Sequence, residues 1–176
     1  MIQQSPWIIA VFVALWAGGM DWRYRRIPNW LTVPGLVVGV AVNTAVHGWP
    51  GLKTSLLGAG LGLVVLLPFV LIRALGAGDW KLTGALGAFL GPGLLVTVLI
   101  GSMLVAGVMA LALVVYKGRL LQTLRNIGRM LGAFLRLRLP GPEVSLDNPE
   151  SVKVPFGVAM ALTVVLCGVG RALGKV

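Results

Sequence analysis

The sequence contains few charged side chains and few metal ligands. Only 11% of its 176 residues are charged, and five acidic residues stand against fifteen lysines and arginines. There is one cysteine, Cys167, and one histidine, His47. A single cysteine excludes an intrachain disulfide and a multi-cysteine zinc site. Because Cys167 and His47 lie far apart on different predicted elements, we expect no metal ion and no cofactor.

Apolar residues are abundant instead. They make up 57% of the chain, and the mean hydropathy is +0.93. Several apolar stretches reach roughly 18 residues, long enough to cross a hydrocarbon core of about 30 Å. The first stretch has neither an early basic region nor an A-x-A-like exit, so we expect it to be retained rather than cleaved. The prediction is an all-α fold: a polytopic membrane helix bundle forming one membrane-embedded domain, 1–176.

Turn-forming residues divide the apolar sequence into six predicted transmembrane helices. The segments "HGWPG" (47–51) and "GPG" (91–93) are typical of turns, and Pro28 disfavours helix at the residue before it. The predicted spans are about 7–20 (continuing as helix toward Ile27), 31–46, 54–72, 79 to the 91–93 turn, 94–116 and 154–169.

The basic residues predict the orientation of these spans. Lysine and arginine accumulate on the cytoplasmic side of membrane proteins. With the N-terminus outside, only Lys53, Arg171 and Lys175 fall on the outer side. The same rule explains the net charge of +10 through lipid contact rather than nucleic acid. The predicted cytoplasmic residues are Arg23, Arg25, Arg26, Arg73, Lys81, Lys117, Arg119, Arg125, Arg129, Arg136, Arg138 and Lys153.

The segment 117–153 differs from the spans. Between Lys117 and Pro140, apolar residues recur every three or four positions and arginines occupy other faces. This pattern is typical of a basic amphipathic helix on the membrane surface. A polar loop with Glu143, Asp147 and Glu150 follows, and we expect these carboxylates to be solvated. The whole segment is therefore predicted to be a cytoplasmic loop with an interfacial helix.

Asp21 and Asp79 are the only acidic residues near the spans, and both fall on the predicted cytoplasmic side. A carboxylate inside a bilayer is unfavourable by about 2.5–3.5 kcal/mol at the centre and usually serves a function. Each could instead pair with an arginine or cap a helix. Together, two carboxylates can divide acid and base roles around one water molecule. Gly76 and Gly78 lack a Cβ and would let backbone approach Asp79 closely.

These two segments resemble the type IV prepilin peptidase family of GxGD-type aspartyl proteases. "DWRYRRIPN" (21–29) matches the family's first motif through Asp21, Ile27, Pro28 and Asn29. "GAGDWK" (76–81) matches its Gly-x-Gly-Asp-x-Lys motif through Gly76, Gly78, Asp79 and Lys81. "VPFGVAMAL" (154–162) is similar to the family's proline-led last span.

The resemblance implies an aspartic endopeptidase of the inner membrane. Its substrate would be a prepilin or pseudopilin, cut at the cytoplasmic face between a short basic leader and an apolar helix. Asp21 and Asp79 would be catalytic. Larger family members also methylate the product and carry a four-cysteine zinc domain. With one cysteine, this chain resembles the short form that serves tight-adherence (Flp) pili, so we expect peptidase activity without methyl transfer.

Other interpretations use the same residues differently. A small ion- or proton-coupled transporter could bind its ion at the two aspartates, although such sites tend to lie near the membrane midplane. A scaffold could use them only as helix caps.

Within the peptidase hypothesis, the helix start at Asp79 favours negative charge there. This predicts Asp79 as the base and Asp21 as the acid. Lys81, two residues further on, points away from Asp79 on a helix and would meet lipid headgroups or a substrate acid. The pattern leaves the oligomeric state open.

Overall fold

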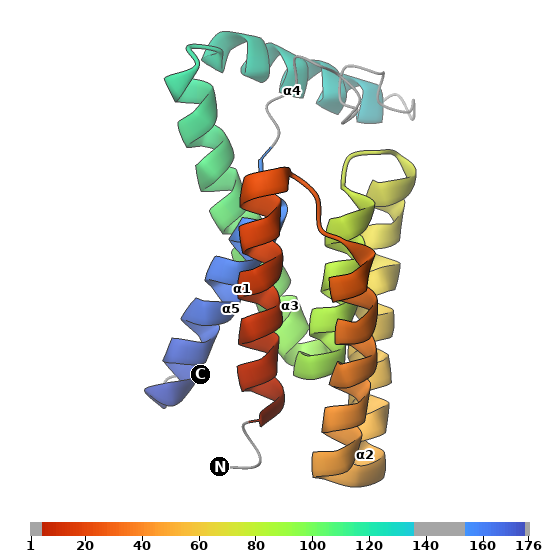
Figure 1. The fold of residues 1–176 in the computed structure, drawn as a ribbon. Coiled ribbons are helices and arrows are strands. Elements are labelled where there is room, and N and C mark those ends of the chain that lie inside the picture. The colour runs from red at the N-terminus through yellow and green to blue at the C-terminus, as the bar shows by residue number, and fades with distance from the viewer. Residues whose placement is uncertain (1–4, 136–153, 175–176) are drawn as a thin grey trace.

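The protein is all-helical over the residues that its computed structural model describes, 5–135 and 154–174. The predicted polar loop with Glu143, Asp147 and Glu150 lies outside these residues. In chain order the helices are α1 (Ser5–Tyr24), α2 (Asn29–Leu71), α3 (Ala77–Tyr116), α4 (Leu120–Leu135) and α5 (Phe156–Ala172) (Figure 1).

A glycine with positive φ breaks each of the two longest helices. Gly48 in α2 has φ 63° and ψ −144°, and Gly91 in α3 has φ 74° and ψ 174°. Glycine adopts such angles without the steric penalty of a Cβ. Figure 1 shows α2 reversing at its lower end, so that its two limbs run antiparallel. The turns predicted at 47–51 and 91–93 are confirmed.

The described chain therefore has five helices rather than six separate ones. Because α2 and α3 are each divided at a single glycine, they supply two limbs apiece, which with α1 and α5 make six apolar segments. The first helix also ends earlier than predicted. Arg25 takes a positive φ of 54°, which stops α1 at Tyr24 before Pro28 is reached. Pro28 instead precedes the first residue of α2, Asn29.

Side chains of α2 donate hydrogen bonds to backbone carbonyls at the break in α3. Pro92 has no N–H, so it cannot donate to the carbonyl of Ala88 four residues earlier. The buried Asn43 amide donates to the carbonyls of Ala88 at 2.8 Å and Phe89 at 2.9 Å. The Ser55 hydroxyl also donates to Ala88, at 2.7 Å. Polar groups in an apolar bundle need such partners, and these bonds lock α2 to α3.

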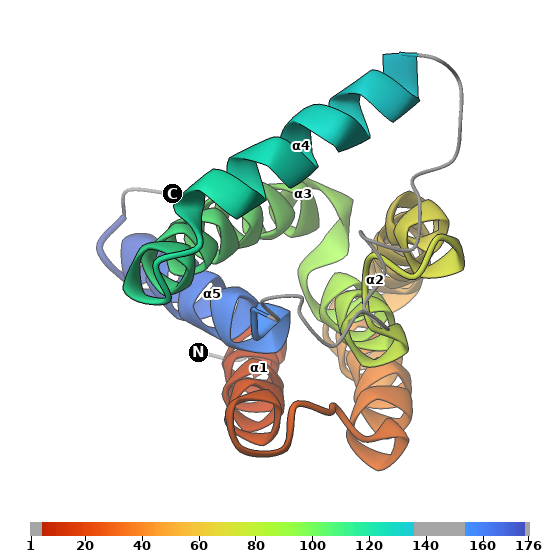
Figure 2. The ribbon, with the colours of Figure 1, turned by 90° about the horizontal axis from the view of Figure 1, so that it is seen from above.

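Small residues let the helices approach closely. α2 packs along α3, and α1 packs along α5, which also contacts α3. A Cβ at Gly58 of α2 would overlap the carbonyl of Gly87 in α3. On the other side, a Cβ at Gly18 of α1 would lie 2.8 Å from Ala161 Cβ in α5. Figure 2 shows the two groups from above, with α1 beside α5 and the first limb of α3 beside α2. Close contact between small residues is how helices associate in lipid.

The outer surface of the bundle is apolar. Phe12, Val64, Leu104 and Val108 are each more than two-thirds exposed. α2 and α3 are long and apolar enough to cross a membrane, and α5 is a shorter apolar helix. An exposed apolar surface of this extent is a poor match to water and suits the hydrocarbon of a lipid bilayer.

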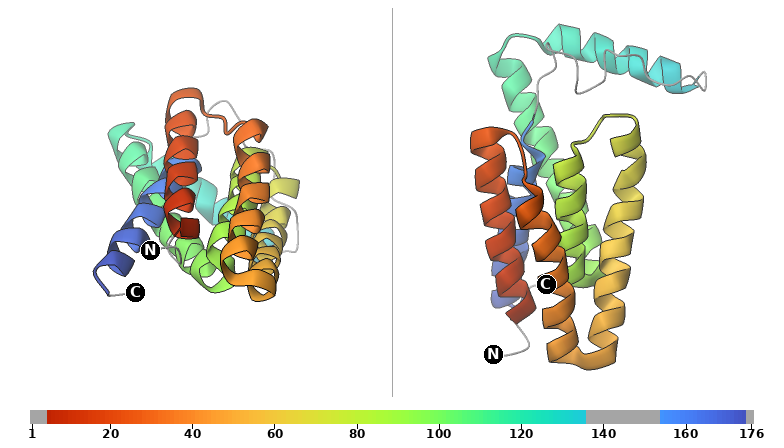
Figure 3. Two further views of the ribbon diagram at one scale, coloured as in Figure 1. Left: turned by 60° about the horizontal axis from the view of Figure 1, so that its bottom comes forward. Right: turned by 45° about the vertical axis from the view of Figure 1, so that its right-hand side comes forward.

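α4 lies across one end of the bundle, at a steep angle to the other helices (Figures 1 and 3). Its position confirms a helix within the predicted 117–140 segment, although the described part covers Leu120–Leu135 only. Leu120, Leu121 and Leu124 are exposed. The orientation on a membrane surface stays a prediction.

Candidate active site

Asp21 lies in the last turn of α1 and is held by a residue of α5. Its side chain is buried, with 7% of its surface exposed. Oδ2 accepts a hydrogen bond of 2.9 Å from the backbone N–H of Gly157. That N–H belongs to the first turn of α5, where backbone donors have no partner within the helix. The carboxylate of Asp21 therefore caps a helix that comes much later in the chain.

Glycine at position 157 leaves room for this contact. A Cβ there would lie 3.0 Å from Asp21 Oδ2 and 2.9 Å from Ile27 Cδ1. Both distances are shorter than ordinary van der Waals contact. Pro155, the residue before the first turn, has an extended backbone and starts α5. The resemblance over 154–162 did not single out Gly157, for which the only signal was a glycine just after a helix-starting proline.

Asp79 lies in the first turn of α3, after Gly76, which starts the helix in an extended conformation. Its carboxylate turns back to the backbone of Gly76, as an acidic side chain at the third helical position commonly does. A Cβ at Gly76 would lie 3.0 Å from Oδ2. Oδ1 is buried and has no hydrogen-bond partner among the described residues. One oxygen of Asp79 therefore faces the start of its own helix, and the other is buried without a described partner.

Ile27 stands between the two aspartates. It is buried, and its Cβ and carbonyl oxygen would each lie 3.1 Å from a Cβ at Gly78, next to Asp79. Its Cδ1 contacts Gly157, next to Asp21. Ile27 therefore packs against the start of α3 and the start of α5. The charge of Asp21 acts on Asp79 at this end of the bundle. Through Ile27, the first motif (21–29) thus packs against Gly78 of the second motif (76–81).

Lys81 and Asn29 form a second link between the motifs. Nζ of Lys81 donates a hydrogen bond of 2.9 Å to Oδ1 of Asn29, at the start of α2. Lys81 therefore points away from Asp79, as its spacing predicts, but its described partner is neither a headgroup nor an acid. Pro28 positions Asn29, since it precedes the first residue of α2 with an extended backbone.

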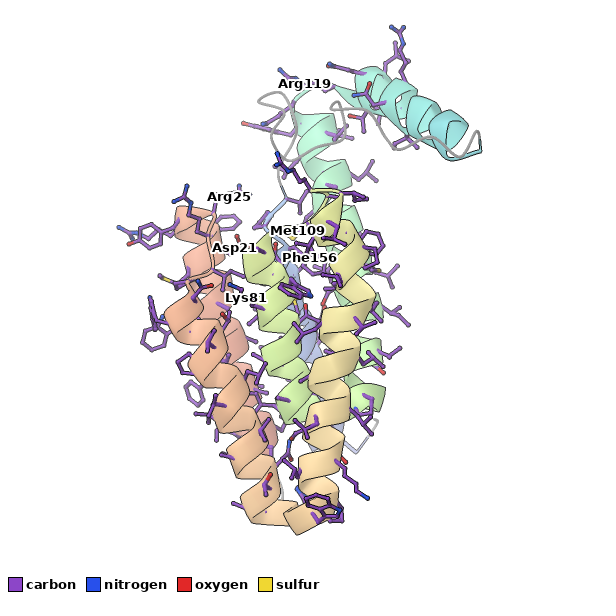
Figure 4. The ribbon with its side chains drawn as sticks, turned by 90° about the vertical axis from the view of Figure 1, so that its right-hand side faces the viewer. Asp21, Arg25, Lys81, Met109, Arg119 and Phe156 are labelled. Atoms are coloured by element: carbon purple, nitrogen blue, oxygen red, sulfur yellow. The ribbon has the colours of Figure 1, made fainter. Side chains whose placement is uncertain are left out.

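A positive charge acts on one member of the pair. The charge of Arg25 acts on Asp21, and Figure 4 shows Asp21, Arg25, Lys81 and Phe156 at the same end of the bundle. Within 5–135 and 154–174, no group of three His, Cys, Asp or Glu side chains could hold a metal ion. The site therefore holds two carboxylates at one end of the bundle: a buried one, Asp21, and a half-buried one, Asp79, whose Oδ1 is buried.

The structure thus brings together all eight residues selected from the sequence, on three helices and one connection. Asp21 comes from α1, Ile27 and Pro28 from the connection, and Asn29 from α2. The remaining four are Gly76, Gly78, Asp79 and Lys81, at the start of α3.

Comparison with known proteins identifies a family. No curated protein and no solved structure matches the chain significantly. The model of the type IV leader peptidase family matches residues 8–111, more than half of the chain, and this range includes Asp21 and Asp79. The chain belongs to the type IV leader peptidase family.

Proposed function

We propose that this membrane peptidase cuts prepilins or pseudopilins between a short basic leader and the apolar helix that follows, with Asp21 and Asp79 as its catalytic pair. The observation that carries the proposal is the meeting of the two motifs: both carboxylates reach one end of the bundle, one on each side of Ile27. Family membership supports peptidase activity. The geometry supports an aspartic mechanism, which needs two interacting carboxylates and one water.

The hydrogen bonds favour a division of roles opposite to the one expected from the sequence. Asp21 accepts the Gly157 N–H, and a hydrogen bond to a carboxylate favours its charged form. Asp79 keeps one buried oxygen without a partner, which suits a carboxylic acid. No pattern in the sequence indicated that Asp21 also meets a helix N-terminus. We infer that Asp21 is the base. Infrared spectra should then show a protonated carboxyl that disappears in Asp79→Asn; its disappearance in Asp21→Asn instead would reverse the roles.

The chemistry then proceeds in two steps. Asp21 takes a proton from water, the water oxygen bonds to the scissile carbonyl carbon, and Asp79 donates its proton to the carbonyl oxygen. The resulting diol collapses as the C–N bond breaks. Asp21 returns its proton to the leaving amine, and Asp79 regains one from a diol hydroxyl. Both carboxyls end as they began, so the site is ready for another turnover.

We also propose that the six apolar segments cross the inner membrane with the aspartates at the cytoplasmic side. The distribution of basic residues supports this orientation. Arg23, Arg25 and Arg26 lie at the aspartate end, as do the loop before α3 and the start of α4, whereas Lys53 and Arg171 lie at the opposite end. The excess of positive charge should face the cytoplasm. α4 would then lie along the inner surface, with its exposed leucines in lipid.

Two further points belong to this proposal. The position of the aspartates at one end of the bundle, rather than near its middle, does not favour a transporter.

One cysteine cannot form the four-cysteine domain of the larger, methylating family members. We therefore propose peptidase activity alone.

Purified protein incubated with candidate prepilins provides the test. Sequencing the N-terminus of each product should place the cut at the end of the basic leader, just before the apolar helix. With S-adenosylmethionine added as a methyl donor, products should still carry an unmodified N-terminus by mass spectrometry. A cut inside the apolar helix would contradict the proposed substrate, and a methylated product would contradict the peptidase-only assignment. The control is the same mixture with Asp79→Asn protein.

A further inference from the structure

Two cavities meet at the end of the bundle opposite the aspartates. The first has a volume of about 290 Å³ and a mixed lining, in which apolar residues accompany polar side chains such as Asn43, His47 and Thr54. The second, of about 330 Å³, is an apolar groove between α1 and α5, lined by Val11, Phe12 and Val165 among others. Trp7 and Arg171 line both cavities. The first cavity, which holds the polar side chains, and the apolar groove therefore lie on either side of one tryptophan–arginine pair.

No carboxylate of the described residues, 5–135 and 154–174, lies near the positive charge at this junction. The guanidinium of Arg171 lies over the Trp7 ring, 5.6 Å from its centroid. No acidic residue lines either cavity, and Asp21 and Asp79, the acidic residues of the described chain, lie at the other end of the bundle. A cation stacked on an aromatic ring keeps its outer donors for an anion. The junction is therefore complementary to a negatively charged group.

Trp7 adds a second unused donor at the same place. Its indole N–H is buried and has no acceptor among the described residues. It packs against Gly168 of α5, where a Cβ would lie 2.6 Å from Nε1. Gly168 therefore allows Trp7 to sit between the two cavities. A buried donor without an acceptor is unfavourable, and an oxygen-rich ligand at the junction would relieve it.

We propose that this junction binds one anionic phospholipid, with an acyl chain in the α1–α5 groove and the phosphate on Arg171. The headgroup occupies the polar cavity beside His47. The arrangement fits a lipid because an apolar tail and an anionic head are needed side by side, at the level where a membrane helix ends. A headgroup with an added ammonium would place a second cation beside Arg171, so phosphatidylglycerol should bind better than phosphatidylethanolamine. The site is independent of the peptidase chemistry.

The test is native mass spectrometry of the detergent-purified protein titrated with phosphatidylglycerol. Arg171→Gln should weaken retention of the first lipid by about tenfold or more, the effect of losing one charge-assisted hydrogen bond. Lys53→Gln is the matched control. Lys53 also stacks on a tryptophan at this end, with Nζ 5.7 Å from the Trp49 ring centroid, but it lines neither cavity. Its loss should leave retention unchanged.

A second pair of variants tests the groove without changing charge. Val165→Trp should fill the groove and displace the lipid, whereas Leu166→Trp, on the exposed side of α5, should not. Equal loss in Arg171→Gln and Lys53→Gln would show nonspecific headgroup contact and overturn the proposal. So would unchanged retention in Val165→Trp, or equal retention of phosphatidylethanolamine and phosphatidylglycerol.

Discussion

The backbone N–H of Gly157 donates a hydrogen bond of 2.9 Å to Oδ2 of Asp21. This bond makes the start of α5 part of the candidate active site, although α5 lies outside the 8–111 range that the family model matches. Gly157 does not touch a reacting atom. It is a positioning residue, and its effect is transmitted through the carboxylate of Asp21.

Replacing Gly157 should impair cleavage more than folding. In Gly157→Ala the new Cβ would crowd Asp21 and Ile27 at 2.9–3.1 Å, so the carboxylate must move. A displacement near 1 Å can lower a rate by about 10²-fold. We expect kcat to fall by that order with little change in KM, measured on a prepilin substrate. Gly19→Ala is the control, since a Cβ there meets nothing within 4 Å. A normal kcat in Gly157→Ala would show that the contact does not set the position of Asp21.

The bond between Lys81 and Asn29 should make their variants interdependent. Lys81→Met and Asn29→Ala remove the same 2.9 Å hydrogen bond from opposite sides. Residues in direct contact couple by about 0.5–3 kcal/mol. The double variant should therefore lose no more kcat/KM than the worse single variant. Additive losses would mean that Lys81 acts on the substrate independently of Asn29. Lys53→Met, at the other end of the bundle, should leave kcat/KM unchanged.

Asn43 should contribute to stability rather than to cleavage. Asn43→Ala leaves the carbonyl of Phe89 without its described side-chain donor, and that of Ala88 with Ser55 alone. Losing a partner for a buried polar group costs about 1–3 kcal/mol. The melting temperature in detergent should fall, while kcat at a temperature well below melting stays close to normal. Thr44→Ala removes only a bond within α2 and should lower the melting temperature less. An equal fall in both variants would contradict the role assigned to the break at Pro92.

Chelation should leave activity intact. The proposed chemistry uses only two carboxyls and a water molecule, so prepilin cleavage should continue after dialysis against EDTA. The measurement is the initial rate before and after dialysis, with re-addition of zinc as the control. Loss of activity followed by recovery with zinc would replace the aspartic mechanism by a metal-dependent one.

The sequence predicted the local features of this fold well because each has a short-range cause. Proline and glycine explain the turns near Gly48 and Gly91. Apolar residues at every third or fourth position, with arginines on other faces, explain α4. The scarcity of acidic residues directed attention to Asp21 and Asp79. The sequence predicted neither the fusion of segments into α2 and α3 nor the early end of α1, which depends on one residue, Arg25, adopting a positive φ.

Contacts between distant segments were the part that the sequence could not supply. The Gly157–Asp21 bond joins residues 136 positions apart, and the contacts of Ile27 depend on how three helices converge. Motif spacing placed Lys81 away from Asp79 but could not identify Asn29 as its partner. The expected proton assignment used only the helix that carries each aspartate. The structure adds the α5 N-terminus beside Asp21. Its N–H favours a charged Asp21, which is why we propose Asp21 rather than Asp79 as the base.

Prepilin cleavage by Asp21→Asn and by Asp79→Asn is the most direct test of the aspartate pair. Asparagine keeps the shape of each side chain and removes its ability to exchange a proton, so each variant alone should lose cleavage completely while remaining inserted and folded, as judged by melting temperature and elution in detergent. Near-normal cleavage by either folded variant would contradict the two-aspartate mechanism.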